Sequence, residues 1–137
     1  MPKADWALLR RKMPALRDHE RAQTAAGLAR LSERILRLGK GTAETRVAYA
    51  LLELGLRLRA IDQVQGRTFH VPLTQQQLGD YVGLSSVHVC RTMRRMVTNG
   101  ILSMRDHMDI RIHDIHALCA LAGAEMEPLD RLIIPPR

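Results

Sequence analysis

The chain has 137 residues, 46% of them hydrophobic, so it is long enough for one domain with a core and too apolar for a wholly disordered protein. Only 3% of the residues are aromatic, which favours helices over a β-sandwich. Two cysteines outside any Cys-x-x-Cys pair exclude a disulfide framework and a zinc finger.

The net charge of +7 indicates a polyanionic partner, although a basic soluble domain without such a partner has the same balance. The excess lies mostly in residues 1–40, which hold ten Lys and Arg against four Asp and Glu. No apolar run approaches the roughly 20 residues of a membrane helix, and the N-terminus lacks the apolar stretch of a secretory signal. We therefore expect no membrane partner and a cytoplasmic, reducing location.

Two helices are predicted in residues 1–40. A short helical pattern covers residues 1–13, and Pro14 is tolerated in the first turn of the next helix, which runs from about Ala15 to Leu38. The second helix ends in an a/d seam with spacings of three, four and three, formed by Leu28, Leu31, Ile35 and Leu38. We predict that this seam is a dimer interface; the alternative is a stripe that faces the core of its own chain.

The next segment predicts a largely buried helix followed by a loop and a short strand. Gly39 to Gly41 breaks the dimerisation helix, and Thr42 caps a helix over residues 43–61. Residues 62–67 are polar and predict a loop. Residues 68–73 alternate and end at a proline, which indicates a short strand.

Residues 74–98 predict two short helices joined by a tight turn. Thr74 caps the first helix and Gly83 stops it. Ser85 or Ser86 caps the second helix, Ser86–Thr98, which the αL-prone pair Asn99-Gly100 closes. The spacing of apolar residues predicts that its inward side chains are Val89, Met93, Met96 and Val97.

The C-terminal third predicts a β-hairpin wing and a last helix. Residues 101–104 and 108–112 read as paired strands around a turn. Asp114 then caps a short helix that Gly123 ends.

The predicted fold is mainly α, a winged helix-turn-helix with a small β-hairpin wing after a long dimerisation helix. The predicted division is an arm with dimerisation helix over 1–40, a DNA-binding domain over 41–123 and a loose tail over 124–137.

The helix-turn-helix unit indicates DNA binding. Its second helix buries one face and shows small, polar and cationic residues on the other, as a helix in the major groove does. The candidate base-contacting residues are Ser86, Val87, His88, Cys90 and Arg91. Arginines further along the helix, Arg94 and Arg95, are candidates for phosphate contacts. The alternative is an ordinary corner of two helices with a solvated charged face.

Several short motifs identify a similar family. In chain order they are Pro72-Leu73-Thr74, Leu78-Gly79-Asp80-Tyr81, Gly83-Leu84-Ser85, Arg91 and Asn99-Gly100-Ile101-Leu102. With them, residues 70–112 resemble the DNA-binding domain of the Crp/Fnr transcription regulators. Upstream, Leu31-Ser32-Glu33-Arg34 and Leu51-Leu52-Glu53-Leu54 are similar to that family's dimer helix and the helix after it. The resemblance covers roughly residues 25–122.

The resemblance implies a homodimer on double-stranded DNA, with half-sites of a pseudo-palindromic operator about 34 Å apart. It places the family's guanine-binding arginine on Arg91, and it places phosphate contacts on Thr74, Gln75 and Gln76 at a helix N-terminus. Many members carry glutamate where this chain has Val87, so the operator is expected to differ from theirs. RNA polymerase is a possible further partner, on a surface that the resemblance does not assign.

One part of the family pattern is missing from this sequence. Only about 25 residues precede the segment that resembles the family's dimer helix, and they hold no strand-rich pattern, Gly-rich loop or cysteine cluster. We expect no cofactor, and specifically no cyclic nucleotide, iron–sulfur cluster or haem bound by these residues. The chain is either a short regulator or a fragment. Two other functions stay open: a module that heterodimerises with a full-length regulator and modulates it, and a basic arm that coats nucleic acid without specificity.

Other readings of single residues are weaker. Cys90 beside Arg91 invites a redox switch, but a small neutral residue that fits the groove is the simpler reading. Cys119 is expected in the core. The spacing of His113, His116 and Cys119 invites a metal site without a fourth ligand, and we expect none. No nucleophile–base pair, HExxH motif or Walker loop is present, so we expect no enzymatic activity.

Overall fold

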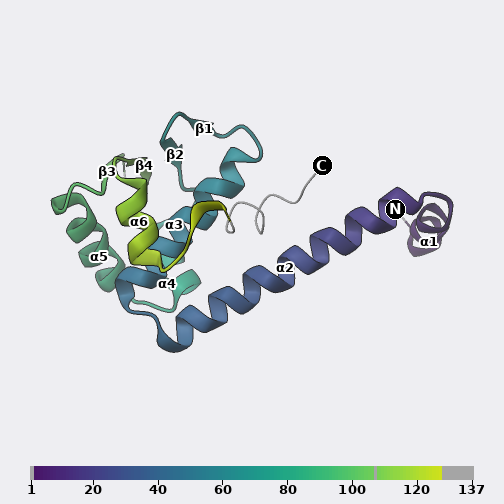
Figure 1. The fold of residues 1–137 in the computed structure, drawn as a ribbon, viewed down its shortest axis with the longest axis horizontal. Helices are drawn as coiled ribbons and strands as arrows, with labels where there is room; N and C mark the ends of the chain where they lie inside the picture. The colour runs from purple at the N-terminus through teal and green to yellow at the C-terminus, as the bar shows by residue number, and fades with distance from the viewer. Residues whose placement is uncertain (1, 107, 128–137) are drawn as a thin grey trace.

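The computed structural model describes residues 2–106 and 108–127. A long helix projects from a domain of helices and short strands, and a short helix lies at its far end (Figure 1). The elements are α1 (Lys3–Lys12), α2 (Pro14–Lys40), α3 (Ala43–Arg59), β1 (Val64–Gln65), β2 (Thr68–His70), α4 (Gln75–Val82), α5 (Ser86–Thr98), β3 (Leu102–Arg105), β4 (Asp109–Ile112) and α6 (Ile115–Ala122). The predicted fold class, a mainly helical winged helix-turn-helix behind a long helix, is confirmed.

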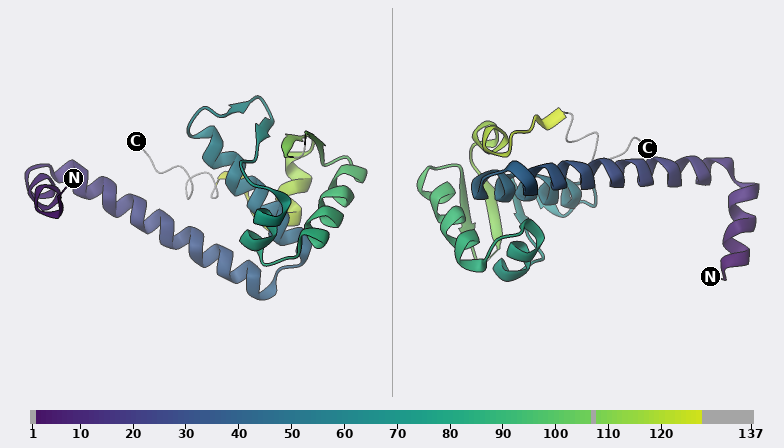
Figure 2. Two further views of the ribbon diagram at one scale, coloured as in Figure 1. Left: turned by 180° about the vertical axis from the view of Figure 1, so that it is seen from behind. Right: turned by 90° about the horizontal axis from the view of Figure 1, so that it is seen from below.

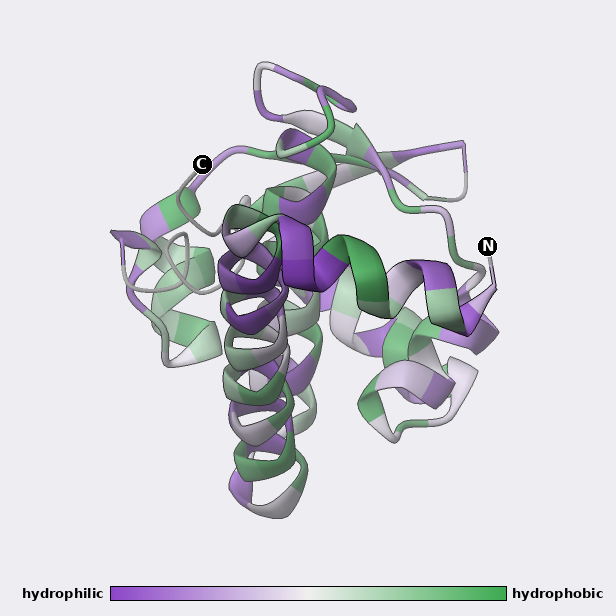
Figure 3. Cartoon of the chain, turned by 90° about the vertical axis from the view of Figure 1, so that its right-hand side faces the viewer, coloured by the Kyte–Doolittle hydropathy of each residue, from purple (hydrophilic) through white to green (hydrophobic). Residues whose placement is uncertain are grey.

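The helix α2 stands apart from the core. Pro14 begins it, as predicted, and α1 turns sharply away from its N-terminal end (Figure 2). Glu20 holds the two together, because it accepts a hydrogen bond from the Trp6 indole at 3.1 Å and pairs with Arg10 at 2.6 Å. Every residue of α2 is described and none is buried. Hydrophobic residues nevertheless recur along its C-terminal half (Figure 3), so this helix exposes an apolar stripe.

The helix α3 is the centre of the core. The Thr42 hydroxyl caps it by accepting the Thr45 N–H at 3.2 Å, as predicted. Most of its length is buried between α5, α6 and the sheet, and burial of each large aliphatic side chain contributes about 1.5–3 kcal/mol. The helix ends at Arg59 rather than at Ile61, because Ile61 has no core to face and is 65% exposed.

The sheet is antiparallel with the strand order β1-β2-β4-β3. The prediction of a loop throughout 62–67 was wrong for β1, where Val64 pairs with Phe69. Gly66, with φ of +63°, allows the tight turn that this pairing needs. The predicted strand over 68–73 ends at His70, since Pro72 has no N–H to continue a ladder.

The last helix, α6, packs against α3. Asp114 caps it by accepting the Ala117 N–H at 2.9 Å, and Gly123 ends it in the left-handed conformation with φ of +60°. Beyond it, Ala124 and Met126 pack against the core. The rest of the predicted tail, residues 128–137, lies outside the described residues. In the described part of the chain, no helix is long and apolar enough to span a bilayer.

The helices α4 and α5 meet at a backbone contact that only glycine permits. A Cβ on Gly79 of α4 would lie 2.5 Å from the carbonyl oxygen of Leu84, in the turn before α5. The Leu84 N–H also donates to the Gly79 carbonyl at 2.9 Å. The position of α5 against α4 therefore depends on Gly79.

Replacing Gly79 with alanine is expected to lower the free energy of unfolding by about 1–3 kcal/mol, because the turn must shift to admit the methyl group. Gly39→Ala is the control, because a Cβ on Gly39 in α2 meets nothing within 4 Å. That change is expected to be neutral or to stabilise by up to about 1 kcal/mol. Urea unfolding followed by circular dichroism measures both, and equal effects would contradict the close contact.

Candidate nucleic-acid interface

The N-terminus of α4 is closed by a reciprocal capping box. The Thr74 hydroxyl accepts the Gln77 N–H at 3.1 Å, and the Gln77 side chain accepts the Thr74 N–H at 2.9 Å. The first N–H groups inside the helix, those of Gln75 and Gln76, have no intrahelical acceptor. Together with the positive end of the helix dipole, they form a site suited to an anionic group. The Gln76 side chain donates to Asp80 at 3.2 Å.

The turn between the helices behaves as predicted. Gly83 takes the left-handed conformation with φ of +69°, which stops α4. Leu84 packs against the core, and Ser85 caps α5 by accepting the His88 N–H at 3.3 Å. The Ser85 hydroxyl also lies 3.1 Å from Nδ1 of the His88 ring, so this imidazole is held against the cap at the edge of α5.

The helix α5 has one buried and one exposed face. Its buried residues are Val89, Thr92, Met93 and Met96. The prediction that Val97 faces inward was wrong: it is 40% exposed, because it lies about 100° around the helix from Met96. Thr92 was missed, although it completes the i, i+3, i+4, i+7 pattern that begins at Val89. At the end of the helix, Gly100 alone takes the left-handed conformation, and Asn99 does not.

The exposed face holds a shallow hollow that brings most of the candidate base-contacting residues together. It is lined by Gln75, Ser86, Val87, Cys90, Arg91 and Arg94. Val87 at the rim is 64% exposed, and Ser86 and Cys90 are half-buried. His88 lies outside the lining. Gln75, predicted to contact phosphate, reaches the hollow from α4, which sequence spacing alone could not show.

The three arginines of α5 differ in their surroundings. Arg91 and Arg94 are exposed and line the hollow. Arg95 forms an ion pair with Glu44 of α3 at 2.7 Å. Residue spacing does not reveal Glu44 as a partner, because the two residues lie 51 positions apart. The pair joins α5 to α3 and holds the Arg95 side chain in place.

The two cysteines lie in different environments. Cys90 is half-buried at the hollow, whereas Cys119 is buried in α6, as predicted. Burial raises the pKa of the Cys119 thiol, so that it stays protonated at neutral pH. Within residues 2–106 and 108–127, no three His, Cys, Asp or Glu side chains are grouped so that they could hold a metal ion. His113 instead lies 2.9 Å from the Ser103 hydroxyl.

The geometry suits the edge of a nucleic acid duplex. A helix with small side chains at its start and arginines further along can approach base edges closely and bind their acceptors. The adjacent N-terminus of α4 offers N–H groups at the same surface. Thus four of the five candidate base contacts and two of the five candidate phosphate contacts, Gln75 and Arg94, line one hollow between two helices whose relative position depends on Gly79.

Comparison with known families places this region in a known class. The model of the Crp-like helix-turn-helix domain matches residues 45–121. This match starts within α3 and ends within α6, so it includes every element of the interface described above.

Curated relatives match over more residues than the family model does. The chain is 36% identical over 93 residues to the transcriptional activator protein FnrA of Stutzerimonas stutzeri, covering 68% of this chain and 37% of that protein. It is 30% identical over 102 residues to the nitrogen fixation regulation protein FixK of Rhizobium meliloti, covering 74% and 46%. The chain thus spans less than half the length of these relatives, which are named as regulators rather than enzymes.

A solved structure matches nearly the whole chain. FixK2 from Bradyrhizobium japonicum superposes with a TM-score of 0.79 at 26% sequence identity, covering 91% of this chain and 61% of that one. A CRP-family transcriptional regulator from Thermus thermophilus shares the fold at 16% identity, with a TM-score of 0.58 over 75% of this chain and 51% of that one. The first match includes much of the α2 segment as well as the domain.

The different burial of the two thiols predicts selective alkylation. Iodoacetamide at neutral pH is expected to modify Cys90 well before Cys119, because the buried thiol is both covered and protonated. Mass spectrometry of the intact protein and its peptides measures the order. Equal rates in the folded protein would contradict the packing of α6, and urea should abolish the difference.

Proposed function

This chain belongs to the family of Crp-like helix-turn-helix domains, and we propose that it is a sequence-specific DNA-binding transcription regulator that acts as a homodimer on a pseudo-palindromic operator. The observation that supports this most directly is the hollow on α5, where Val87, Cys90 and Arg91 lie together. The regulatory names of the curated relatives agree with the proposal.

The proposed base contacts follow from the chemistry of the hollow. Arg91 donates to guanine O6 and N7, the most common specific contact of an arginine in the major groove. Val87 and Cys90 are apolar or weakly polar and suit the methyl group of thymine, whereas neither accepts strongly from cytosine N4. Ser86 at the helix start is small enough to admit the base edge. His88, held by Ser85, contributes at the border of the site.

The proposed phosphate contacts flank these residues. Thr74, Gln75 and Gln76 present the N-terminus of α4, and Arg94 extends from the exposed face of α5. Arg95 can bind a phosphate only while sharing its charge with Glu44, so we assign it a smaller role than Arg94. Such contacts fix the position of the protein on the duplex and contribute no sequence preference themselves.

The proposed homodimer interface is the exposed stripe on α2. Leu28 is 61% exposed and Ile35 60%, with Leu31 and Leu38 between and beyond them at a/d spacing. A stripe of this kind exposes apolar surface whose burial contributes about 25 cal/mol per Å². Pairing two copies would cover it and place two α5 helices about one turn of DNA apart, on the order of 34 Å.

The exposed stripe also favours a second candidate function. The chain could pair through the same stripe with a full-length regulator and modulate it. In either role we propose a cytoplasmic location. RNA polymerase is a proposed further partner. We also propose that residues 1–40 and 41–123 are separate functional units. The first pairs with a second protein chain, and the second binds DNA.

Replacing Arg91 with alanine is expected to weaken binding to the cognate operator by about 1–3 kcal/mol and to relax preference at one base position. Binding to random DNA should change much less, because the lost contact reads a base. Arg21→Ala on α2 is the control, since it removes the same charge away from the hollow. Fluorescence anisotropy at fixed salt measures both, and equal losses on cognate and random DNA would contradict the base-reading role.

Replacing Leu31 and Ile35 together with glutamate is expected to give a monomer, because the charges repel across the paired stripe. Operator affinity should fall steeply as the second half-site is lost. The control is Leu36→Glu, an equally exposed leucine at 56% that lies about 100° around the helix from Ile35. Light scattering gives the mass, and a double variant that keeps the dimer mass would reject the stripe as the interface. If regulatory activity is lost on changing Leu31 and Ile35 but kept on changing Arg91, the modulator is favoured instead.

A further inference from the structure

The joint between α2 and the DNA-binding domain is polar. No residue of α2 is buried, although the Leu38 side chain reaches the domain, 3.1 Å from where a Cβ on Gly83 would lie. The C-terminal turns of α2 also present Arg34 and Arg37, three positions apart and therefore on neighbouring parts of one face. Both side chains reach across to residues of other elements.

Arg34 connects α2 to α3 and α4. Its guanidinium donates to both oxygens of the Glu53 carboxylate, at 3.0 and 3.3 Å, and to the Tyr81 hydroxyl. It also lies over the Tyr81 ring, with the guanidinium carbon 4.1 Å from the ring centroid. Glu53 is completely buried, so its charge requires a partner: Arg34 lies 3.0 Å from the carboxylate, and Arg57 on α3 itself lies 4.0 Å away. Burial, with the charge of Glu53, raises the pKa of Tyr81 to about 12, which keeps the hydroxyl protonated.

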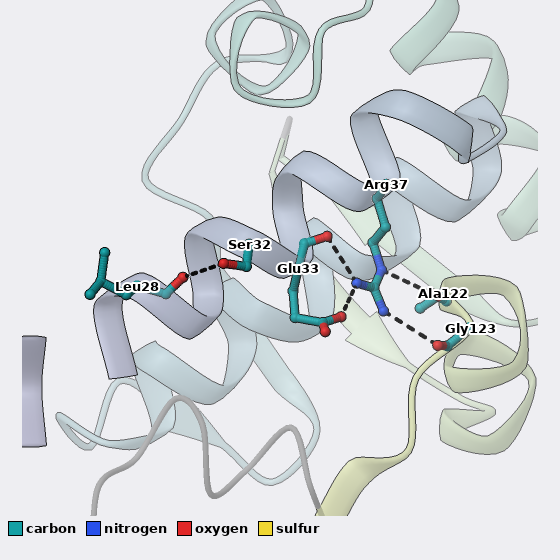
Figure 4. Close-up of polar contacts among 6 residues, drawn as sticks. All are labelled: Leu28, Ser32, Glu33, Arg37, Ala122 and Gly123. Carbon is teal, nitrogen blue, oxygen red and sulfur yellow. Dashed lines mark hydrogen bonds and ion pairs between the residues drawn. The ribbon is translucent and has the colours of Figure 1, made fainter. Parts of the chain in front are cut away.

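Arg37 connects α2 to α3 and α6. Its guanidinium stacks on the Tyr49 ring, with the guanidinium carbon 3.7 Å from the ring centroid. It also donates hydrogen bonds to the carbonyl oxygens of Ala122 and Gly123, at 3.2 and 3.3 Å. These carbonyls belong to the C-terminal end of α6, where a cation is favourable. Glu33 on the preceding turn pairs with Arg37 and orients it (Figure 4). The Arg37 side chain is only 11% exposed.

The two arginines hold α2 at separate points, one on α3 and α4 and the other on α3 and α6. A third arginine, Arg46, closes the turn by donating to the carbonyls of Leu38 and Gly41 at 2.8 and 3.0 Å. Planar guanidinium groups that stack and donate at once permit one orientation, unlike a flexible ammonium. The stripe proposed for pairing, residues 28–38, includes the positions of Arg34 and Arg37, so a rotation at this joint turns the whole domain relative to the paired helices.

We propose that Arg34 and Arg37 are positioning residues that determine which spacing between half-sites the dimer accepts. This rests on the proposed function, namely pairing through α2 and reading through α5. If two α2 helices pair, the distance and angle between the two α5 helices follow from the angle at each joint. One base pair of added spacing moves a half-site by about 3.4 Å and turns it by about 34°. A rigid joint rejects such a change, whereas a loose joint tolerates it.

The first test is a series of duplexes in which two half-sites are separated by stepwise increments of one base pair. Wild-type affinity is expected to peak at one spacing and to fall on the order of tenfold on either side, a typical size for coupling between sites. Arg37→Met should flatten this profile while leaving the dimer mass and the affinity for a single half-site unchanged. Arg37→Lys should not restore the profile, because lysine keeps the charge without the planar group.

A second variant tests the role of Arg34 without leaving the buried carboxylate of Glu53 charged. Arg34→Met alone would remove the nearer of the two arginines that pair with the buried Glu53, so it is combined with Glu53→Gln. This double variant should flatten the spacing profile in the same way. Arg21→Met, on a residue of α2 that only approaches Asp18 at 3.8 Å, is the matched control and should keep the wild-type profile.

A measurement without DNA tests the same joint. Spin labels on Cys90 of both protomers, in a Cys119→Ala background, report the distance between the two recognition helices. The distribution should be narrow in the wild type and broad in Arg37→Met. A variant with lower unfolding free energy but unchanged spacing and distance profiles would overturn the positioning role and leave the proposed function intact. A wild type that binds no paired half-sites would overturn both.

Discussion

The buried carboxylate of Glu53 is the constraint on which the arrangement of this molecule depends. A charge that is fully removed from water must be paired, and Arg34 pairs it from α2, outside the core. On α3 itself, Arg57 lies farther from this carboxylate, at 4.0 Å, so the closest countercharge comes from α2. No residue of α2 is buried, and this ion pair and the stacked Arg37 join it to the domain together with the contact between Leu38 and Gly83.

A second constraint acts inside the domain, at the contact between Gly79 and Leu84. There the backbones of α4 and the following turn approach so closely that a methyl group does not fit. That contact orients α5, and the Glu44–Arg95 ion pair ties the same helix to α3. The helix α3 thus contacts both neighbouring helices through carboxylates: Glu53 pairs with Arg34 of α2, and Glu44 pairs with Arg95 of α5. The exposed stripe and the exposed hollow are related through one rigid helix.

The parts of the fold that depend on local chemistry could be predicted from the sequence. Caps at Thr42, Thr74 and Asp114 are formed by residues within three positions, and Gly83 needs only its own conformational freedom. Helical periodicity likewise separated the buried and exposed faces of α5. It failed at Val97 because an apolar residue beside the stripe satisfies the pattern loosely, without facing the core.

The parts that depend on long-range contacts could not be predicted. The strand β1 consists of two residues, and only its pairing with β2 distinguishes it from a loop. The arginines at the joint read as surface charges in the sequence, because Glu53 lies 19 positions from Arg34, Tyr81 lies 47, and the Ala122 carbonyl lies 85 from Arg37. For the same reason, spacing indicated which residues of α5 face outward but not that Gln75 joins them at the hollow.

We propose that two copies of α5 read the DNA sequence together. Selection of bound duplexes from a random library, with the purified protein at physiological salt, tests this proposal. We expect recovery of an inverted repeat with a guanine in each half-site and centres about one helical turn apart. Recovery of no shared sequence, with binding that collapses as salt is raised, would contradict it and indicate attraction to the phosphate backbone alone.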